Sequence, residues 1–190
     1  GLHAKVWLVH SLAGESAMPG KQVVCETPRL ILRRMIMEDL DFIASMLADP
    51  EVMQFYPHCY DREQATRWVQ GVLDGYDRCG HSFFLVADRQ THQPRGQVGL
   101  LSPNVDGVEE FEIGYMIHQP FWRQGIATEA AIATRDYALE ELGKRRLISL
   151  IRPINIPSRG VAEKVGMTVE KTTFYKEIEH LVFSLSEDED

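Results

Sequence analysis

The chain has 190 residues, of which 44% are hydrophobic and 25% are charged, and its 20 basic and 28 acidic residues give a formal charge of −8. The length and composition are those of one globular domain. The excess of acidic residues argues against a nucleic-acid partner, because phosphate-backbone binding needs clustered lysine and arginine. No apolar run reaches the ~18 residues that a membrane-spanning helix requires, so we expect no membrane association.

Hydrophobic periodicity and turn residues predict the elements in chain order. A strand over 29–35 is followed by helices over 40–47 and 63–79, and then by strands over 83–87, 97–101 and 111–117. A long helix over 125–142, an apolar strand over 147–151, a short helix over 158–165 and closing strands over 167–170 and 181–185 complete the order. No linker or repeat interrupts it. We therefore expect a single domain over 23–186, an N-terminal extension over 1–22 with Met18 as a candidate start, and an acidic tail over 187–190.

Local signals refine two of these predictions. The strands between 83 and 117 follow one another through short turns, which predicts an antiparallel meander. Asp61 is expected to cap the helix over 63–79, and Gly80 is expected to end it.

The cysteines and histidines do not have the spacing of metal ligands. The three cysteines are odd in number and lie far apart, at Cys25, Cys59 and Cys79, and the seven histidines contain no H-x-x-x-H pair. We therefore expect no metal site. The cysteine pattern favours a reducing compartment, and we expect a cytoplasmic protein.

The most informative stretch, 119–130, has the sequence QPFWRQGIATEA and joins a strand to the long helix. Peptide N–H groups of residues 123–127 are expected at the N-terminus of that helix, where free donors and the helix dipole favour an anion. Gly125 allows a close approach of the backbone to such an anion. A pyrophosphate fits this description, and so does a plain tight turn into a core helix.

A second stretch, 155–167, begins where the apolar strand ends. Asn155 lies at that strand end, and Ser158 opens the short helix. Taken alone, Asn155 is a turn residue and Ser158 is an N-cap.

These two stretches, together with the sequence EIGY over 112–115 and EKVGM over 163–167, resemble the GCN5-related N-acetyltransferases. The nearest branch is that of the ribosomal-protein alanine N-acetyltransferases RimJ and RimL, whose opening is similar to TPRLILR over 27–33. The resemblance covers about residues 26–185. It implies an α+β fold with a twisted, mainly antiparallel sheet of six or seven strands flanked by helices. Two parallel strands of that sheet would splay apart to hold acetyl-CoA.

The resemblance also implies acetyl-CoA as the cosubstrate, without a metal, and assigns its binding residues. Backbone groups expected to pair with the pantetheine amides, as an added strand pairs with a sheet edge, belong to Met116, Ile117 and His118. Residues expected around the pyrophosphate are Arg123, Gln124, Gly125, Ile126, Ala127 and Thr128. Asn155 is expected to bind the pantetheine arm, and Ser158 to lie near the thioester sulfur.

The implied catalytic groups are Glu112 and Ser158. Many family members carry a tyrosine that protonates the leaving thiolate at the position of Ala162, so Ser158 is expected to take this role, directly or through a water. Glu112 is expected to be the base, with Glu110 on the same strand face as the alternative. Glu112 is equally well explained as a carboxylate that pairs with an arginine or faces solvent.

The implied reaction is direct acetyl transfer to a primary amine. The branch favours a protein or peptide N-terminal amine, and a small-molecule amine such as a polyamine, aminoglycoside or amino acid is the alternative. Aromatic residues over 55–60 are placed to line the acceptor pocket or to pack beneath their loop. Ala162 leaves open a CoA-binding module without activity, and the 123–128 turn alone would suit a nucleotide-phosphate binder. The sequence is compatible with a monomer or a homodimer.

Overall fold

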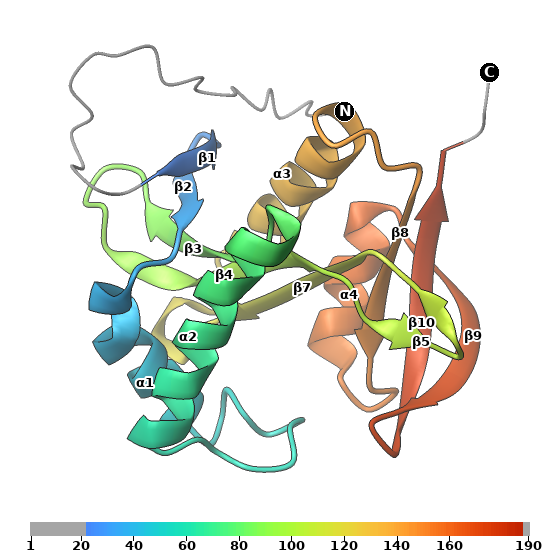
Figure 1. The fold of residues 1–190 in the computed structure, drawn as a ribbon, viewed down its shortest axis with the longest axis horizontal. Helices are drawn as coiled ribbons and strands as arrows, with labels where there is room; N and C mark the ends of the chain where they lie inside the picture. The colour runs from blue at the N-terminus through green and yellow to red at the C-terminus, as the bar shows by residue number, and fades with distance from the viewer. Residues whose placement is uncertain (1–21, 188–190) are drawn as a thin grey trace.

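The computed structural model describes residues 22–187, so the expectations for the N-terminal extension and for most of the acidic tail lie outside the described residues. Eight strands form the main sheet (Figure 1). In the order in which they lie side by side, they are β1 (Val23–Glu26), β2 (Leu30–Arg34), β3 (Phe83–Asp88), β4 (Pro94–Leu101), β7 (Glu112–Ile117), β8 (Arg146–Ile151), β10 (Ile178–Ser186) and β9 (Thr168–Tyr175). A separate small hairpin consists of β5 (Asn104–Val105) and β6 (Val108–Glu109).

Helices pack on both faces of the sheet. On one face, the 3-10 turn η1 (Met37–Asp39) leads into α1 (Leu40–Ala48), which packs against α2 (Arg62–Cys79). On the other, the 3-10 turn η2 (Gln119–Phe121) precedes α3 (Ile126–Glu140), which packs on β4 and β7 beside α4 (Ile156–Val165). In Figure 1, α2 crosses in front of the sheet and α3 lies behind it. The predicted α+β class is confirmed.

Neighbouring strands of the main sheet are antiparallel, except for β7 and β8, which are parallel. The predicted mainly antiparallel sheet is thus confirmed, but it has eight strands rather than six or seven. The additional strand is β1, which pairs with β2. Its four residues are too few to show a readable alternation, and pairing with β2 decides their conformation.

The helix ends follow local capping chemistry. The side chain of Asp61 accepts a hydrogen bond of 2.8 Å from the N–H of Gln64, and Gly80 closes α2 at a φ of 77°, as predicted. Helix α4 starts earlier than expected, because Asn155 is its N-cap and accepts a bond of 3.2 Å from the N–H of Ser158. Ser158 is therefore inside the first turn, and its hydroxyl is not the cap.

A buried ion pair fixes η1 against β2. The guanidinium of Arg33 donates two hydrogen bonds of 2.8 Å to the two carboxylate oxygens of Asp39. Only 1% of Arg33 and 6% of Asp39 is exposed. One of these oxygens also accepts a bond of 2.9 Å from the N–H of Ile36. The Asp39 carboxylate thus compensates a buried charge and holds the chain at the start of η1.

Two further findings concern residues 22–187. In this part of the chain, no group of three or more histidine, cysteine, aspartate or glutamate side chains is arranged to hold a metal ion. None of the helices in the same range is both long and apolar enough to cross a membrane.

Candidate active site

The parallel strands β7 and β8 separate soon after they meet. Their one registered pair joins Glu112 to Ile148. Beyond this pair, side chains replace the hydrogen bonds between the two backbones. The Ser149 hydroxyl donates a hydrogen bond of 2.7 Å to the carbonyl of Ile113, and the N–H of Leu150 donates one of 2.9 Å to Glu112 Oε2. Because side chains now satisfy these backbone groups, the strands diverge without leaving them unpaired. The predicted splayed pair is confirmed.

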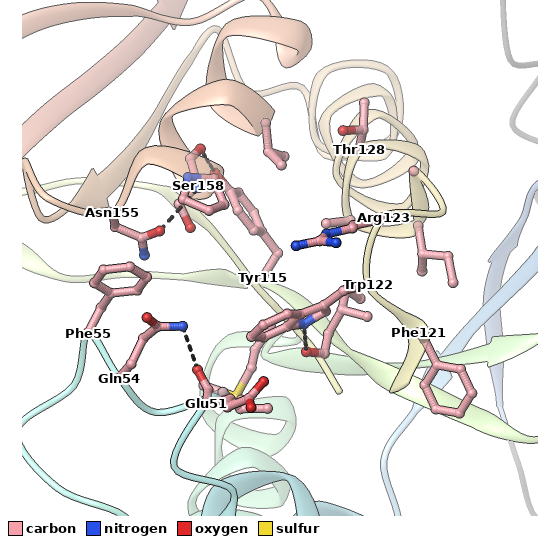
Figure 2. A pocket seen from close by; sticks show the side chains of 18 of the residues that line it. Glu51, Gln54, Phe55, Tyr115, Phe121, Trp122, Arg123, Thr128, Asn155 and Ser158 are labelled. Carbon is pink, nitrogen blue, oxygen red and sulfur yellow. Dashed lines mark hydrogen bonds between the residues drawn. The ribbon is translucent and has the colours of Figure 1, made fainter. Parts of the chain in front are cut away.

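A cavity of about 440 Å³ lies at the open end of this gap (Figure 2). Its walls come from the α1–α2 loop, the end of β7, the start of α3 and the start of α4. Nine of the predicted site residues line it: Met116, Ile117, Arg123, Gly125, Ile126, Ala127, Thr128, Asn155 and Ser158. The structure does not bring Glu112, His118 or Gln124 to the cavity wall.

The start of α3 supplies the cavity with free backbone donors. Gly125 precedes the helix at a φ of 74°, in the left-handed region that favours glycine, and its carbonyl accepts the first helical bond, from Glu129. The N–H groups of the first turn therefore have no partner within the helix, and the helix dipole makes them attractive to an anion.

Arg123 adds a full positive charge to this end of the cavity. It adopts a φ of 62°, a conformation that is uncommon for residues other than glycine and that concentrates at functional sites. Its guanidinium points into the cavity (Figure 2). Within residues 22–187, no hydrogen bond or ion pair engages that guanidinium.

Of the three residues expected to offer backbone groups, Met116 and Ile117 end β7 and His118 follows it, and Ile117 has the suitable orientation. The N–H of His118 bonds to the carbonyl of Arg95 beside β4, and the carbonyl of His118 accepts from Phe121. Because backbone groups alternate sides along a strand, Ile117 faces the open edge, and there its carbonyl accepts 2.7 Å from Trp122 Nε1. The expectation that His118 contributes its backbone to a cofactor is not supported by this geometry, because both groups are used elsewhere.

Glu112 lies at the closed end of the gap, where β7 and β8 still pair. It is only partly exposed, and burial raises the pKa of its carboxyl to about 7, opposed by the bond from the N–H of Leu150 and by the charge of Lys176. A carboxyl with this pKa is half ionised near neutral pH. Such a group exchanges protons readily at physiological pH, as a general base must.

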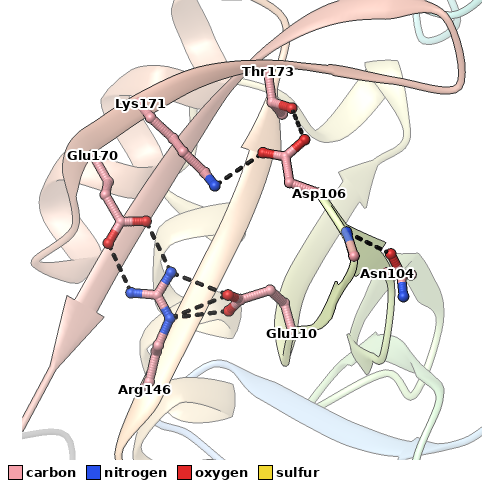
Figure 3. Close-up of polar contacts among 8 residues, drawn as sticks. Asn104, Asp106, Glu110, Arg146, Glu170, Lys171 and Thr173 are labelled. Carbon is pink, nitrogen blue, oxygen red and sulfur yellow. Dashed lines mark hydrogen bonds and ion pairs between the residues drawn. The ribbon is translucent and has the colours of Figure 1, made fainter.

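Glu110, the alternative base, is committed elsewhere. Both of its carboxylate oxygens accept from Arg146, at 3.0 to 3.4 Å, and Arg146 also donates two bonds of 2.8 and 2.9 Å to Glu170 (Figure 3). We expected Glu110 on the same strand face as Glu112, but Glu110 lies two residues before β7, outside the strand whose alternation that expectation used. Its ion pair favours Glu112 as the base.

Tyr115 and Asn155 hold the first turn of α4. The hydroxyl of Tyr115 donates a hydrogen bond of 2.6 Å to the carbonyl of Ser158, and the side chain of Asn155 accepts a hydrogen bond from the N–H of Ser158. Burial raises the pKa of Tyr115, so its hydroxyl stays protonated and remains a donor. No residue in the described range hydrogen-bonds to the hydroxyl of Ser158, which lines the cavity beside these contacts.

The α1–α2 loop forms the remaining wall. Phe55 and Tyr56 line the cavity, as the aromatic stretch predicted, whereas Tyr60 packs on the ring of Trp68 under the loop. Arg152 donates 3.0 Å to the carbonyl of Phe55 and so ties the loop to the β8–α4 connection.

Sequence reasoning missed the loop residues Glu51 and Gln54, which also line the cavity. They carry no periodic or motif signal, because loop positions acquire their surroundings from the fold.

A splayed parallel pair with an anion-attracting helix start beside it defines a fold that can hold an extended, negatively charged cosubstrate. Residues 29–168 match the acetyltransferase (GNAT) domain family. The chain belongs to that family and is an acyltransferase. The predicted family and enzyme class are confirmed.

The relatives agree with this assignment. The chain is 35% identical over 149 residues to YkkB of Bacillus subtilis, a match that covers 77% of this chain and 86% of YkkB. An acetyltransferase from Agrobacterium tumefaciens has a similar structure, with a TM-score of 0.76, 27% identity and coverage of 92% of this chain and 98% of that one. RimL, a ribosomal-protein α-N-acetyltransferase solved with coenzyme A, shares the fold with a TM-score of 0.70, 17% identity and coverage of 84% and 95%.

Proposed function

We propose that this acetyltransferase moves an acetyl group from acetyl-CoA directly to a primary amine, and that the amine is a protein or peptide N-terminus. The observation that carries the proposal is the convergence, on one cavity, of three features: the strand gap, the N–H groups at the start of α3, and the guanidinium of Arg123, which has no partner among residues 22–187. The donors and the cation suit a pyrophosphate, and the gap suits the narrow pantetheine arm.

The residues present fit this cosubstrate as follows. The pyrophosphate would bind the N–H groups of 125–128 and the guanidinium of Arg123. The N–H of Ile117 at the open edge and the amide of Asn155 would bind the pantetheine arm, since the Ile117 carbonyl already accepts from Trp122. These contacts leave the thioester near Ser158, at the start of α4.

The transfer itself needs one proton removed and one supplied. The acceptor nitrogen attacks the thioester carbon, so that a C–N bond forms as the C–S bond breaks. The proton that the amine loses passes to Glu112 through water, since Glu112 does not reach the cavity wall. The departing thiolate accepts a hydrogen bond from the Ser158 hydroxyl, directly or through a water, and its proton comes from solvent through this contact, so that Ser158 keeps its own proton in balance.

The α1–α2 loop would bind the acceptor. It contributes Glu51, Phe55 and Tyr56 to the cavity wall, and Figure 2 shows Glu51 and Phe55 away from Thr128 of α3. A carboxylate beside aromatic rings suits a cationic amine. The fold shared with RimL, which is named for acetylating a ribosomal protein, supports a peptide N-terminus as the first candidate.

The proposal is tested by calorimetric titration with acetyl-CoA, followed by thiol release over N-terminal peptides, polyamines and aminoglycosides. We expect binding and turnover with peptides. Turnover with polyamines or aminoglycosides alone would make the acceptor a small molecule. Binding without turnover on any amine would indicate a silent CoA-binding module, and equal affinity for simple nucleotides would indicate a phosphate binder.

Glu112→Gln is expected to lower kcat most between pH 7 and the pKa of the acceptor amine. Below about pH 7 the wild-type carboxyl is itself protonated, and above the pKa of the amine no base is needed. The kcat values of the two enzymes should therefore approach each other at both ends of the pH range. Glutamine keeps an acceptor for the N–H of Leu150, which preserves the gap. The measurement is kcat from pH 5.5 to 10, with Glu163→Gln on exposed α4 surface as the control. If the ratio of wild-type kcat to variant kcat does not vary with pH, Glu112 is not the base.

Ser158→Ala is expected to lower kcat about a hundredfold, the lower end of the usual effect of general acids, because a thiolate is an easy leaving group. The affinity for CoA should stay unchanged, since Asn155 rather than Ser158 caps α4. Steady-state kinetics and calorimetry on the same preparation separate the two quantities. An unchanged kcat would show that the leaving thiolate takes its proton from solvent without help from Ser158.

A further inference from the structure

Arg29 lies between β1 and β2, about a hundred residues before α3, and its side chain reaches the turn that precedes this helix. Arg29 Nη1 donates a hydrogen bond of 2.8 Å to the carbonyl of Gln124, and Arg29 Nε donates one of 2.7 Å to Glu129 Oε1. The second oxygen of Glu129 accepts from the hydroxyl of Thr27 at 2.6 Å and from the N–H of Arg29 at 3.2 Å. Four hydrogen bonds thus join the β1–β2 turn to the start of α3.

The bond to Gln124 sets the direction of the next N–H group. In a trans peptide the C=O and the N–H point in opposite directions. The carbonyl of Gln124 faces Arg29, outside the cavity wall, so the N–H of Gly125 faces the other way, toward the cavity that Gly125 lines. A peptide that is held before a ligand arrives loses no freedom on binding it.

The Arg29 guanidinium also changes the charge at this place. Its Nη2 lies 3.4 Å from the position that a Cβ would occupy on Gly125, so the cation rests against the glycine. Glu129 carries a carboxylate in the first turn of α3, where it would repel an anion bound at the helix start. Arg29 pairs with this carboxylate and neutralises it.

The β1–β2 turn is itself anchored. The carbonyl of Arg29 accepts a hydrogen bond of 2.9 Å from the N–H of Arg89, and the Arg89 side chain donates one of 3.0 Å to the carbonyl of Thr27. Thr27 is buried. The β1–β2 turn, from which Arg29 reaches the turn before α3, is therefore held in place by its own hydrogen bonds.

We propose that Arg29 is a positioning residue for the cosubstrate, which orients the Gln124–Gly125 peptide and neutralises Glu129 at the pyrophosphate site. The inference rests on the proposed function, because it assumes that the anion at α3 is the pyrophosphate of acetyl-CoA. Half of the Arg29 side chain (51%) is exposed, and exposed ion pairs contribute little to stability. A loss of CoA affinity in an Arg29 variant is thus separable from unfolding.

The experiment compares wild type with Arg29→Ala, using CoA in calorimetry and two donors in kinetics. We expect the Kd for CoA to rise roughly tenfold to a hundredfold, because the N–H of Gly125 is no longer oriented and the Glu129 carboxylate is no longer neutralised, with kcat at saturating acetyl-CoA unchanged. S-acetylpantetheine lacks the pyrophosphate, so its kcat/KM should not change. Adding Glu129→Gln to Arg29→Ala should recover part of the affinity by removing the uncompensated carboxylate.

The matched control is Arg67→Ala, which removes an arginine of similar exposure from its ion pair with Glu63 on α2. It should bind CoA as the wild type does. If wild type binds CoA and Arg29→Ala binds it equally well, the inference is wrong while the proposed function stands. If Arg29→Ala loses activity with both donors alike, its role is structural and the inference is again wrong. A wild-type protein that binds no CoA would overturn the proposed function, and the inference with it.

Discussion

Gly125→Glu is expected to abolish CoA binding in a protein that still folds. A Cβ at residue 125 would lie 3.4 Å from Arg29 Nη2, at the turn that lines the cavity, so the longer side chain of glutamate would disturb both this arginine and the N–H groups of α3 beside it. Its carboxylate would add a negative charge at the end of the helix that attracts anions. The φ of 74° adds about 1–2 kcal/mol of backbone strain for any residue with a Cβ. Calorimetry with CoA should show no measurable heat of binding.

Two further variants separate the causes of that loss. Gly125→Ala carries the same backbone strain without the charge, so it should weaken CoA binding without abolishing it. Gly80→Glu places the same residue at a φ of 77° at the end of α2, where no atom lies within 4 Å of the added Cβ, and should bind CoA normally. Wild-type affinity in Gly125→Glu would remove the cofactor assignment for this turn.

Asp39→Ala is expected to lower the free energy of unfolding by about 3–5 kcal/mol, the usual cost of leaving one member of a buried ion pair without its partner. Arg33 would keep its charge in the core, and the N–H of Ile36 would lose its acceptor. Since whole domains are stable by about 5–15 kcal/mol, this is a large fraction of the total. Urea denaturation followed by circular dichroism measures the change.

The matched control is Asp41→Ala. Asp41 pairs with Arg62 at 2.6 Å, but 85% of the Asp41 side chain and 64% of the Arg62 side chain is exposed. This variant should lose less than about 1 kcal/mol. If Asp39→Ala does not fold, the double variant Arg33→Met with Asp39→Asn removes both charges and keeps an acceptor for Ile36, and it should fold. Equal losses in Asp39→Ala and Asp41→Ala would contradict the role given to burial.

Local chemistry made much of the fold predictable. Asp61 and Gly80 bound α2 through contacts within a few residues, so the sequence alone locates the helix. The turn before α3 was readable for the same reason, because the glycine and the following helix are adjacent in the chain. The early start of α4 was not, because Asn155 and Ser158 are both residues that cap helices and only the folded chain decides between them.

The remaining features depend on contacts between distant residues. The width of the gap is set by Glu112 and Ser149, whose side chains take the place of ladder bonds, and periodicity shows none of this. Arg29 meets Glu129 across a hundred residues. A pattern of residue types predicts the family and its motifs, but it does not contain such pairings.

The divergence of β7 and β8 divides the sheet into a block of five strands, β1 to β4 with β7, and a block of three, β8 to β10. Arg146 of β8 connects the blocks on the closed side through its ion pair with Glu110, and its pair with Glu170 lies within the block of three. A ligand strand laid along Ile117 would join them on the open side. Below the gap, the two blocks share one hydrophobic core, to which strands of both contribute. Because such a ligand would bind only the folded chain, we expect the supply of substrate to raise the resistance of the protein to unfolding.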